Sequence, residues 1–166
     1  SASKARLELL ESVGITPDKI LNTNIDETPK KSEKPLDYVS RIALEKNKSV
    51  KKKKIEIVLT ADTVVALGRR ILQKPNDEEE ALYFLNLLSG RRHKVYTSIC
   101  IFYKEKYYQK NVNTTLKMKR LSDDEKKCYL LSDEWKGKAG GYSIQGAASY
   151  FFPFISGSYS NVVGLP

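Results

Sequence analysis

Residues 55–75 read IEIVLTADTVVALGRRILQKP, and this stretch decides the fold of the chain. Residues 55–67 form a nearly continuous apolar, β-branched run, which predicts a buried strand. The run contains a carboxylate, Asp62, and a Gly-Arg-Arg turn then leads to Lys74 and a proline. Burying an ionised carboxylate is costly unless a metal, a cation or hydrogen bonds compensate. Asp62 is therefore either part of a chemical site or a structural residue that caps or binds a turn, and the stretch alone allows both.

The segments around this strand predict a mixed α/β domain whose sheet has an antiparallel component. Apolar residues recur at helical spacing over residues 36–48, which indicates an amphipathic helix. Asn76 is expected to cap a second helix that ends before Gly90. Alternating apolar residues over 95–101 predict a strand, and a polar break separates it from an extended run over 107–118. We expect these two runs to pair as an antiparallel hairpin.

The length of 166 residues predicts a single domain spanning residues 1–166. The chain opens on Ser-Ala-Ser-Lys, where a strand would just have ended, so we expect a short N-terminal strand to be missing from this sequence. No apolar run approaches the roughly 18 residues of a membrane span, and no signal peptide is visible. A membrane partner is not expected, and the predicted location is cytoplasmic.

The cysteines and the histidine exclude several kinds of site. Cys100 and Cys128 lack metal-ligand spacing, and Cys100 lies in an apolar run, which favours a small core side chain over a disulfide. His93 is the single histidine. A histidine-based metal site or a Ser-His-Asp triad is therefore not expected.

The net charge of +9 indicates an anionic partner such as a nucleotide, a nucleic acid or another polyphosphate. Much of the excess lies in residues 46–54, which we interpret as a solvated linker. No recognition-helix pattern, zinc finger or aromatic stacking motif is present, so a nucleic-acid partner is not favoured.

Phosphate-binding groups can be proposed at three places in the chain. Ser1, Ser3 and Arg6 stand at a helix start, where hydroxyls, backbone N–H groups and the helix dipole favour a phosphate. An ordinary helix cap explains the same residues. Lys74 follows an apolar strand and precedes a proline that fixes its position. Lys46 is the other candidate, and either lysine alone could be a surface residue.

The carboxylates Asp62 and Glu27 are candidate metal ligands. Two such oxygens suit Mg²⁺ or Mn²⁺, which keep several waters and share substrate phosphates. A water activated by the metal and a base could then attack a phosphorus atom. The residues alone do not separate this site from a set of unrelated surface groups.

The ordered motifs of the chain resemble those of the Maf family of nucleoside triphosphate pyrophosphatases, which is related in fold to the inosine triphosphatase group. The resemblance runs nearly from end to end. The matching segments, in chain order, are Ser1-x-Ser3-x-x-Arg6-x-x-Leu9-Leu10, Ile25-Asp26-Glu27, Ile42-Ala43-x-x-Lys46, Ala61-Asp62-Thr63-Val64-Val65, Lys74-Pro75, Ser89-Gly90-x-x-His93-x-Val95-x-Thr97, Lys138–Gly146 and Gly157–Pro166.

This resemblance implies a fold of two lobes around a central cleft. It also implies cleavage of a nucleoside triphosphate between the α and β phosphates, which gives monophosphate and pyrophosphate, with Mg²⁺ or Mn²⁺ as cofactor. Asp62 would accept the proton of the attacking water and contribute to the metal site, and Glu27 would help to hold the metal. Family members often form homodimers, so a homodimer is a further expectation.

The resemblance also implies a set of substrate-binding residues, namely Ser1, Ser3, Arg6, Lys46, Thr63, Lys74 and Gln145. Arg6, Lys46 and Lys74 would bind the triphosphate, and their positive charge suits a developing anionic leaving group. Thr63 and Gln145 match positions linked to base selection. His93 is expected to hold its loop together rather than to take part in catalysis.

The sequence departs from the family at Lys4 and Ala5, where the family has Pro-Arg. Members with that arginine prefer dTTP, UTP and modified uridine triphosphates, and a branch with a bulky residue there prefers 7-methyl-GTP. Ala5 fits neither branch, whereas Thr63 and Gln145 favour the pyrimidine branch. The resemblance also implies a role in removing non-standard or surplus nucleotides. The alternatives are a 7-methyl-GTP pyrophosphatase, a non-catalytic nucleotide- or nucleic-acid-binding module, and a structural protein of cell division.

Overall fold

The computed structural model describes residues 3–52 and 57–166. Within these residues the strands form a five-stranded sheet in the order β2-β1-β3-β4-β5, and every neighbouring pair is antiparallel. The strands are β1 (Val58–Leu67), β2 (Arg70–Leu72), β3 (Arg92–Tyr103), β4 (Lys106–Lys117) and β5 (Phe154–Ser156). The helices are α1 (Lys4–Glu11), α2 (Pro35–Ser49), α3 (Glu78–Leu88), α4 (Asp123–Leu131), α5 (Tyr159–Val163) and the short 3₁₀ turns η1 (Ala139–Gly141) and η2 (Ala147–Phe151).

The long hairpin of β3 and β4 confirms the pairing expected from the alternating sequence. The two strands pair from Arg92↔Lys117 to Tyr103↔Lys106. Lys104 and Glu105 connect them with φ angles of 47° and 62°. Two consecutive positive φ angles give the turn whose twist matches that of paired strands.

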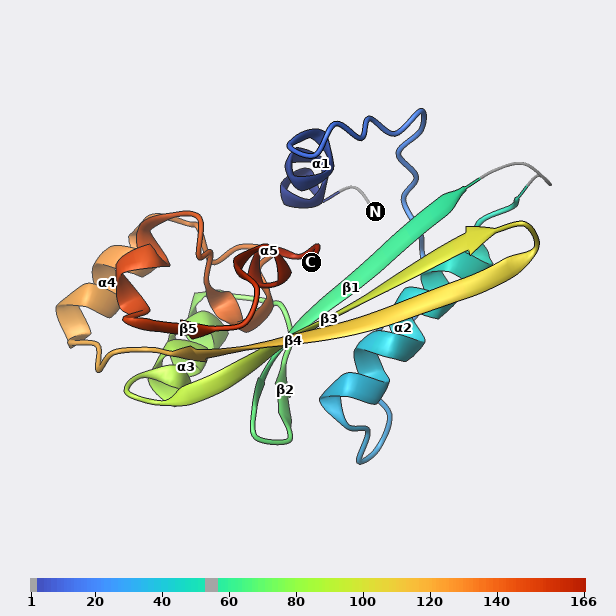
Figure 1. Cartoon of the computed structure of the whole chain (residues 1–166). Coiled ribbons are helices and arrows are strands. Elements are labelled where there is room, and N and C mark those ends of the chain that lie inside the picture. The colour runs from blue at the N-terminus through green and yellow to red at the C-terminus, as the bar shows by residue number, and fades with distance from the viewer. Residues whose placement is uncertain (1–2, 53–56) are drawn as a thin grey trace.

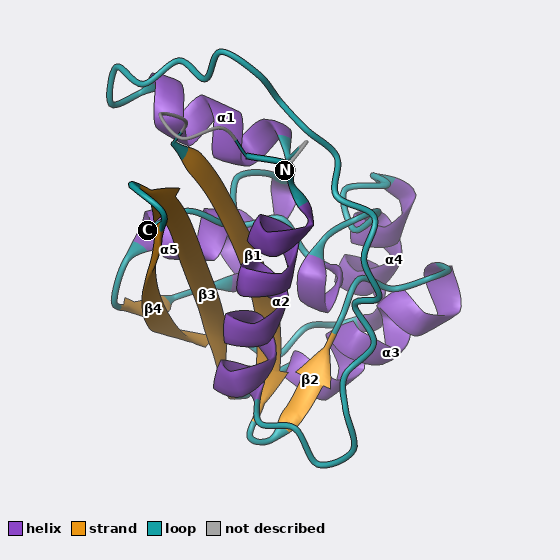
Figure 2. Cartoon of the chain, turned by 90° about the vertical axis from the view of Figure 1, so that its right-hand side faces the viewer, coloured by secondary structure: helices purple, strands orange, loops and turns teal. Residues whose placement is uncertain are grey.

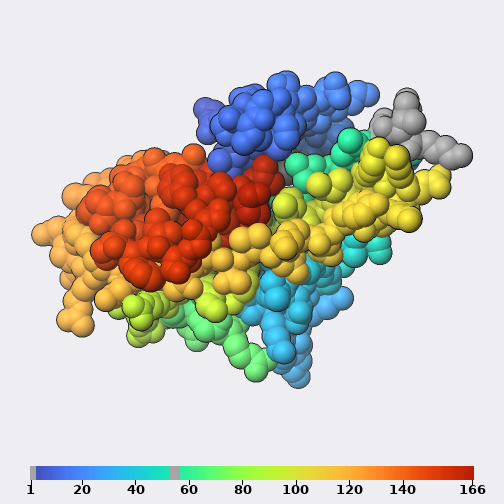
Figure 3. Space-filling view, in the orientation of Figure 1, coloured from blue at the N-terminus to red at the C-terminus, as the bar shows by residue number. Residues whose placement is uncertain are grey.

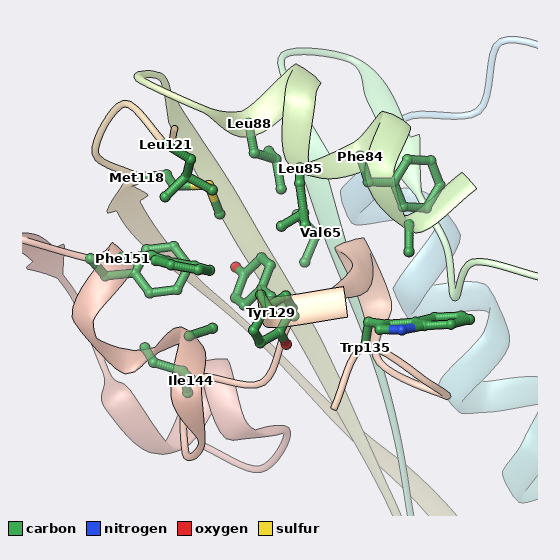
Figure 4. Packing of buried hydrophobic residues seen from close by; sticks show 14 of the residues in the cluster. Val65, Phe84, Leu85, Leu88, Met118, Leu121, Tyr129, Trp135, Ile144 and Phe151 are labelled. Atoms are coloured by element: carbon green, nitrogen blue, oxygen red, sulfur yellow. The ribbon is translucent and has the colours of Figure 1, made fainter. Parts of the chain in front are cut away.

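Helices cover the two faces of the sheet at different places. Figure 1 shows α2 along one end of the long strands, with α3, α4 and α5 gathered around the other end. Figure 2 shows, from the side, α2 lying over β1 and β3. The described buried side chains accordingly form a smaller cluster under α2 and a larger one between the sheet and the other helices. In the larger cluster Leu85 of α3 lies beside Val65 of β1 (Figure 4).

β1 is buried on both faces, which explains its continuous apolar sequence. Thr60 donates to the Ala43 carbonyl of α2, and Val64 packs in the smaller cluster with Ile42. Val65, the next residue, belongs to the larger cluster. Successive side chains of a strand point to opposite faces, so Asp62 shares the α2 face of the sheet with Thr60 and Val64.

Three boundaries differ from those expected from the sequence. β1 begins at Val58, so Ile57 is not part of the strand expected over 55–67, and residues 55 and 56 lie outside the described part. The side chain that caps α3 is Asp77, which accepts from the Glu80 backbone N–H at 2.8 Å, so the assignment of Asn76 as the cap was wrong. α2 continues to Ser49, and Lys46 is only 9% exposed. The interpretation of the whole run 46–54 as a solvated linker was therefore wrong at its start, because its first residues turn inward on α2; residues 53 and 54 lie outside the described part.

The expectation that Cys100 is a small core side chain is confirmed. Cys100 is fully buried and Cys128 is exposed, and both are free thiols. None of the helices in the described ranges is both long and apolar enough to cross a membrane.

Candidate active site

Asp62 lies inside β1 and binds a lysine of α2. The Lys46 ammonium Nζ lies 2.8 Å from Asp62 Oδ1, and Asp62 is only 6% exposed. Burial raises the pKa of the Asp62 carboxyl above its ordinary value, while Lys46 and Arg6 oppose the rise. A carboxylate held in this way is a stronger base than one in water. Asp62 is thus neither a cap nor a turn-binding residue but one half of a buried ion pair.

Glu27 approaches the same ammonium from the irregular segment before α2. Its Oε1 atom lies 2.8 Å from Lys46 Nζ, and 40% of its side chain remains exposed. Lys46 therefore holds two carboxylates next to each other, one buried and one open to solvent. The residues offered Glu27 and Asp62 as candidate metal ligands, the family resemblance implied the same pair, and the structure brings both to Lys46.

This pair of carboxylates fits a divalent metal of the Mg²⁺ type. Such an ion takes oxygen ligands, uses one or two carboxylates and completes its shell with water and substrate phosphates. The described residues contain no group of three or more His, Cys, Asp or Glu side chains that could hold an ion alone. Asp62 and Glu27 match the partial, substrate-completed site and not a closed protein cage.

Arg6 joins the first helix to β1 and to the last turn of the chain. Its Nη2 donates to Thr63 Oγ1 at 3.0 Å, and its Nε donates to the Gly164 carbonyl at 2.7 Å. Burial lowers the pKa of Arg6 from its ordinary value, whereas Asp62 and Glu27 oppose that change. The guanidinium is therefore a fixed positive charge at the site.

Thr63 and Ser3 are tied into this part of the structure. Thr63 Oγ1 lies 2.9 Å from Thr97 Oγ1, and Thr97 in turn donates to the Asn161 carbonyl at 3.0 Å. The Ser3 side chain accepts from the backbone N–H of Arg6, so it caps α1. Ser3 thus caps the helix, as the sequence allowed, and it also lines the pocket described below.

One pocket of about 470 Å³ unites the sequence-predicted residues that the structure describes. Its lining includes Ser3, Arg6, Glu27, Lys46, Asp62, Thr63, Lys74 and Gln145. Ser1 lies outside the described residues. Lys74 and Gln145 are both exposed at the pocket wall. Ala5 also lines the pocket, so the site borders the position at which the sequence departs from its family.

Sequence reasoning missed some of the pocket wall. Lys138 and Tyr142 line it, although both lie in the glycine-rich motif that was recognised from the sequence. With Lys138, the lining residues that the structure describes include four basic and two acidic side chains, which leaves the site positive. Lys138 could have been predicted from the sequence, because it is the first residue of that motif.

The buried His93 supports the pocket wall. It is 2% exposed, and its Nε2 lies 2.9 Å from the Tyr142 hydroxyl. Both rings also contact Phe152. His93 therefore holds the glycine-rich segment in place through Tyr142. The sequence had predicted such a structural role for His93 rather than a catalytic one.

Comparison with known proteins gives consistent results. A model of the family described as Maf-like protein matches residues 1–166. The chain is 51% identical over 166 residues to a dTTP/UTP pyrophosphatase of Ruegeria sp. (strain TM1040), and 53% identical over 166 residues to a dTTP/UTP pyrophosphatase of Cereibacter sphaeroides. Each match covers 100% of this chain and 86% of the relative.

A third relative bears a broader name. The chain is 52% identical over 170 residues to a nucleoside triphosphate pyrophosphatase of Neorickettsia sennetsu, a match that covers 100% of this chain and 80% of the relative. The family model spans the motifs that build the pocket, from Arg6 to Gly164. This chain belongs to the family of Maf-like proteins.

Proposed function

We propose that this protein is a nucleoside triphosphate pyrophosphatase that acts on dTTP and UTP. The observation that carries the proposal is the buried Asp62, held by Lys46 beside Glu27 in a pocket that also contains Arg6 and Lys74. This arrangement offers a base, two metal ligands and several positive charges within one cavity. The names of the relatives supply the choice of nucleotide.

In the proposed reaction, Asp62 orients a water molecule and accepts its proton. The water oxygen forms a bond to the α-phosphorus, and the bond between that phosphorus and the α–β bridging oxygen breaks. The bridging oxygen keeps the electron pair and leaves as part of pyrophosphate. The burial that raises the pKa of Asp62 makes its carboxylate a better proton acceptor.

The basic side chains neutralise the substrate and the leaving group. Lys74 is exposed at the pocket wall, where it can bind a phosphate with little rearrangement. Lys46 and Arg6 are held in place by protein contacts and act as fixed charges. A divalent cation held by Glu27 and Asp62 would add Lewis-acid stabilisation of the phosphate oxygens.

Base selection is proposed to depend on the pocket wall that contains Gln145. Gln145 is exposed and its amide can both donate and accept hydrogen bonds, as the edge of a pyrimidine requires. Thr63 supports this side indirectly, because its hydroxyl is engaged by Arg6 and Thr97.

The test is pyrophosphate release from a panel of dTTP, UTP, CTP, GTP and 7-methyl-GTP, with Mg²⁺ or Mn²⁺. We expect the highest kcat/KM with dTTP and UTP and no release after the metal is removed by a chelator. A preference for 7-methyl-GTP would reject the proposed substrate class. Tight nucleotide binding without turnover would instead indicate a non-catalytic module.

Two further expectations belong to this proposal. We place the enzyme in the cytoplasm, where its nucleotide substrates are found, and we propose that it forms a homodimer. Fractionation of cells tests the first, and sedimentation velocity tests the second.

A further inference from the structure

The main-chain carbonyl of Glu27 accepts hydrogen bonds from two side chains. The Tyr38 hydroxyl donates to it at 2.9 Å, and Gln73 Nε2 donates to it at 3.1 Å. Gln73 Nε2 also lies 3.0 Å from the Tyr38 hydroxyl oxygen. Gln73, Tyr38 and the Glu27 carbonyl thus form a closed triangle of hydrogen bonds, which we call the Glu27 clamp.

The clamp joins three parts of the pocket that are far apart in the sequence. Tyr38 belongs to α2, which also carries Lys46. Gln73 follows β2 and immediately precedes Lys74, and its own carbonyl accepts from the backbone N–H of Gly140 at 3.0 Å. Gln73 therefore binds the Glu27 segment through its side chain and the glycine-rich segment through its backbone carbonyl, and it directly precedes Lys74.

Glu27 needs such support because it lies in an irregular segment. The structure assigns no helix or strand to the described residues between α1 and α2. Fixing the backbone of a residue outside regular structure costs conformational entropy. The clamp opposes this loss at Glu27, and Arg41 of α2 does the same at the next residue by donating to the Thr28 carbonyl at 3.1 Å.

The clamp is built to persist over the neutral pH range. Tyr38 is 3% exposed, and a tyrosine hydroxyl is protonated at neutral pH and can donate. The Gln73 amide does not titrate. Both donors are therefore present under the conditions in which a nucleotide would be bound.

We propose that Gln73 and Tyr38 are positioning residues that hold Glu27 with its carboxylate facing Asp62, where the two would share a divalent metal. This inference rests on the proposed function, because it assumes that Glu27 is a metal ligand. Gln73 and Tyr38 act through the Glu27 backbone and do not touch the reacting atoms.

The experiment compares Gln73→Met and Tyr38→Phe, each of which keeps the approximate size of the side chain but removes the two clamp hydrogen bonds in which that side chain takes part. Gln109→Met is the matched control: Gln109 Nε2 also donates to a backbone carbonyl, that of Ser40 in α2, at 2.6 Å, but Ser40, unlike Glu27, does not line the pocket. Mn²⁺ affinity is measured by electron paramagnetic resonance of the free ion, and melting temperatures are recorded for each variant.

We expect each clamp variant to weaken Mn²⁺ binding about tenfold, the lower end of the effect of residues that support metal ligands. Gln109→Met should bind Mn²⁺ as the unsubstituted protein does. A loss of melting temperature without a loss of Mn²⁺ affinity would show that the clamp is merely structural and would overturn the proposal.

A double-mutant cycle separates this proposal from the proposed function. If Gln73 acts through Glu27, then Gln73→Met in a Glu27→Gln background causes no further loss of Mn²⁺ affinity. Independent, additive losses would overturn the positioning role. If the unsubstituted protein bound no Mn²⁺ at millimolar concentrations, the metal role of Glu27 itself would be wrong. The absence of pyrophosphate release from every nucleotide, with Mn²⁺ binding intact, would reject the activity alone.

Discussion

Replacing Asp62 by asparagine is expected to abolish most of the activity without destabilising the protein. Folding raises the pKa of Asp62. The stability that this group contributes is therefore fully present below its unfolded pKa and is lost as the pH rises through its folded pKa. At pH 7 the buried, ionised carboxylate costs stability, and asparagine removes that cost.

The lost contact with Lys46 acts in the opposite direction, but Lys46 keeps its partner Glu27 at 2.8 Å. We therefore expect the free energy of unfolding to change by less than about 1 kcal/mol, which corresponds to about 3 °C in a domain of this size. Loss of a general base should lower kcat by about 10²- to 10⁴-fold. By contrast, the free energy of unfolding typically falls by about 3–5 kcal/mol when a buried ion pair loses one partner and the other charge is left uncompensated.

The assays are pyrophosphate release under saturating dTTP and thermal unfolding at pH 7. Asp18→Asn serves as the control, because Asp18 is exposed and lies outside the pocket. If Asp62→Asn lowered the melting temperature by 10 °C or more, in the range that an uncompensated pair implies for a domain of this size, Asp62 would be a structural residue. If its kcat stayed within about threefold of that of the unsubstituted protein, far short of the loss of a general base, the catalytic role would be refuted.

Three further predictions follow from the same structure. Lys46→Met should move the acid limb of the pH profile of kcat/KM to higher pH, because Lys46 is the main group that lowers the pKa of Asp62. If the limb did not move, it would not report the protonation of Asp62. Gly140→Ala should lower the melting temperature more than Gly137→Ala, because both have positive φ angles but only at Gly140 would a Cβ lie 2.8 Å from Val65; equal losses would show that crowding does not matter. Burial lowers the pKa of His93 to about 4, so the unfolded chain takes up a proton first, and stability should fall by about 3 kcal/mol as the pH drops from about 6.5 to about 4; denaturant unfolding of His93→Phe should show a smaller fall over this interval.

The sequence was most informative where one physical factor dominates. The alternation over 95–101 specifies a half-buried strand, and the hairpin formed as expected. The continuous run around Asp62 specifies a strand covered on both faces, which β1 is. The α3 cap was assigned one residue too early because Asn76 and Asp77 are both good caps, and the choice depends on which backbone adopts the extended conformation.

The parts of the site that could not be predicted from the residues alone depend on long-range contacts. Glu27 lies in a segment without periodicity, so nothing local places it beside Lys46. The family resemblance implied that Glu27 and Lys46 belong to one site, but it did not pair them and carried no information on Gln73 or Tyr38. Their contacts with the Glu27 carbonyl join positions 46 and 11 residues apart, and such pairings follow only from the packed fold.

The contact between Arg6 and Gly164 sets an order in which the protein can become functional during synthesis. Figure 3 shows the N-terminal segment resting directly above residues near 160, and the hydrogen bond from Arg6 spans 158 positions. At typical translation speeds a ribosome needs roughly 10 to 30 seconds to make a segment of that length. Throughout this interval Arg6 has been made and the Gly164 carbonyl has not. A nascent chain therefore carries Asp62 and Lys46 before it carries the Gly164 carbonyl that accepts from Arg6, and we expect the pocket to be complete only after residue 164 has been made.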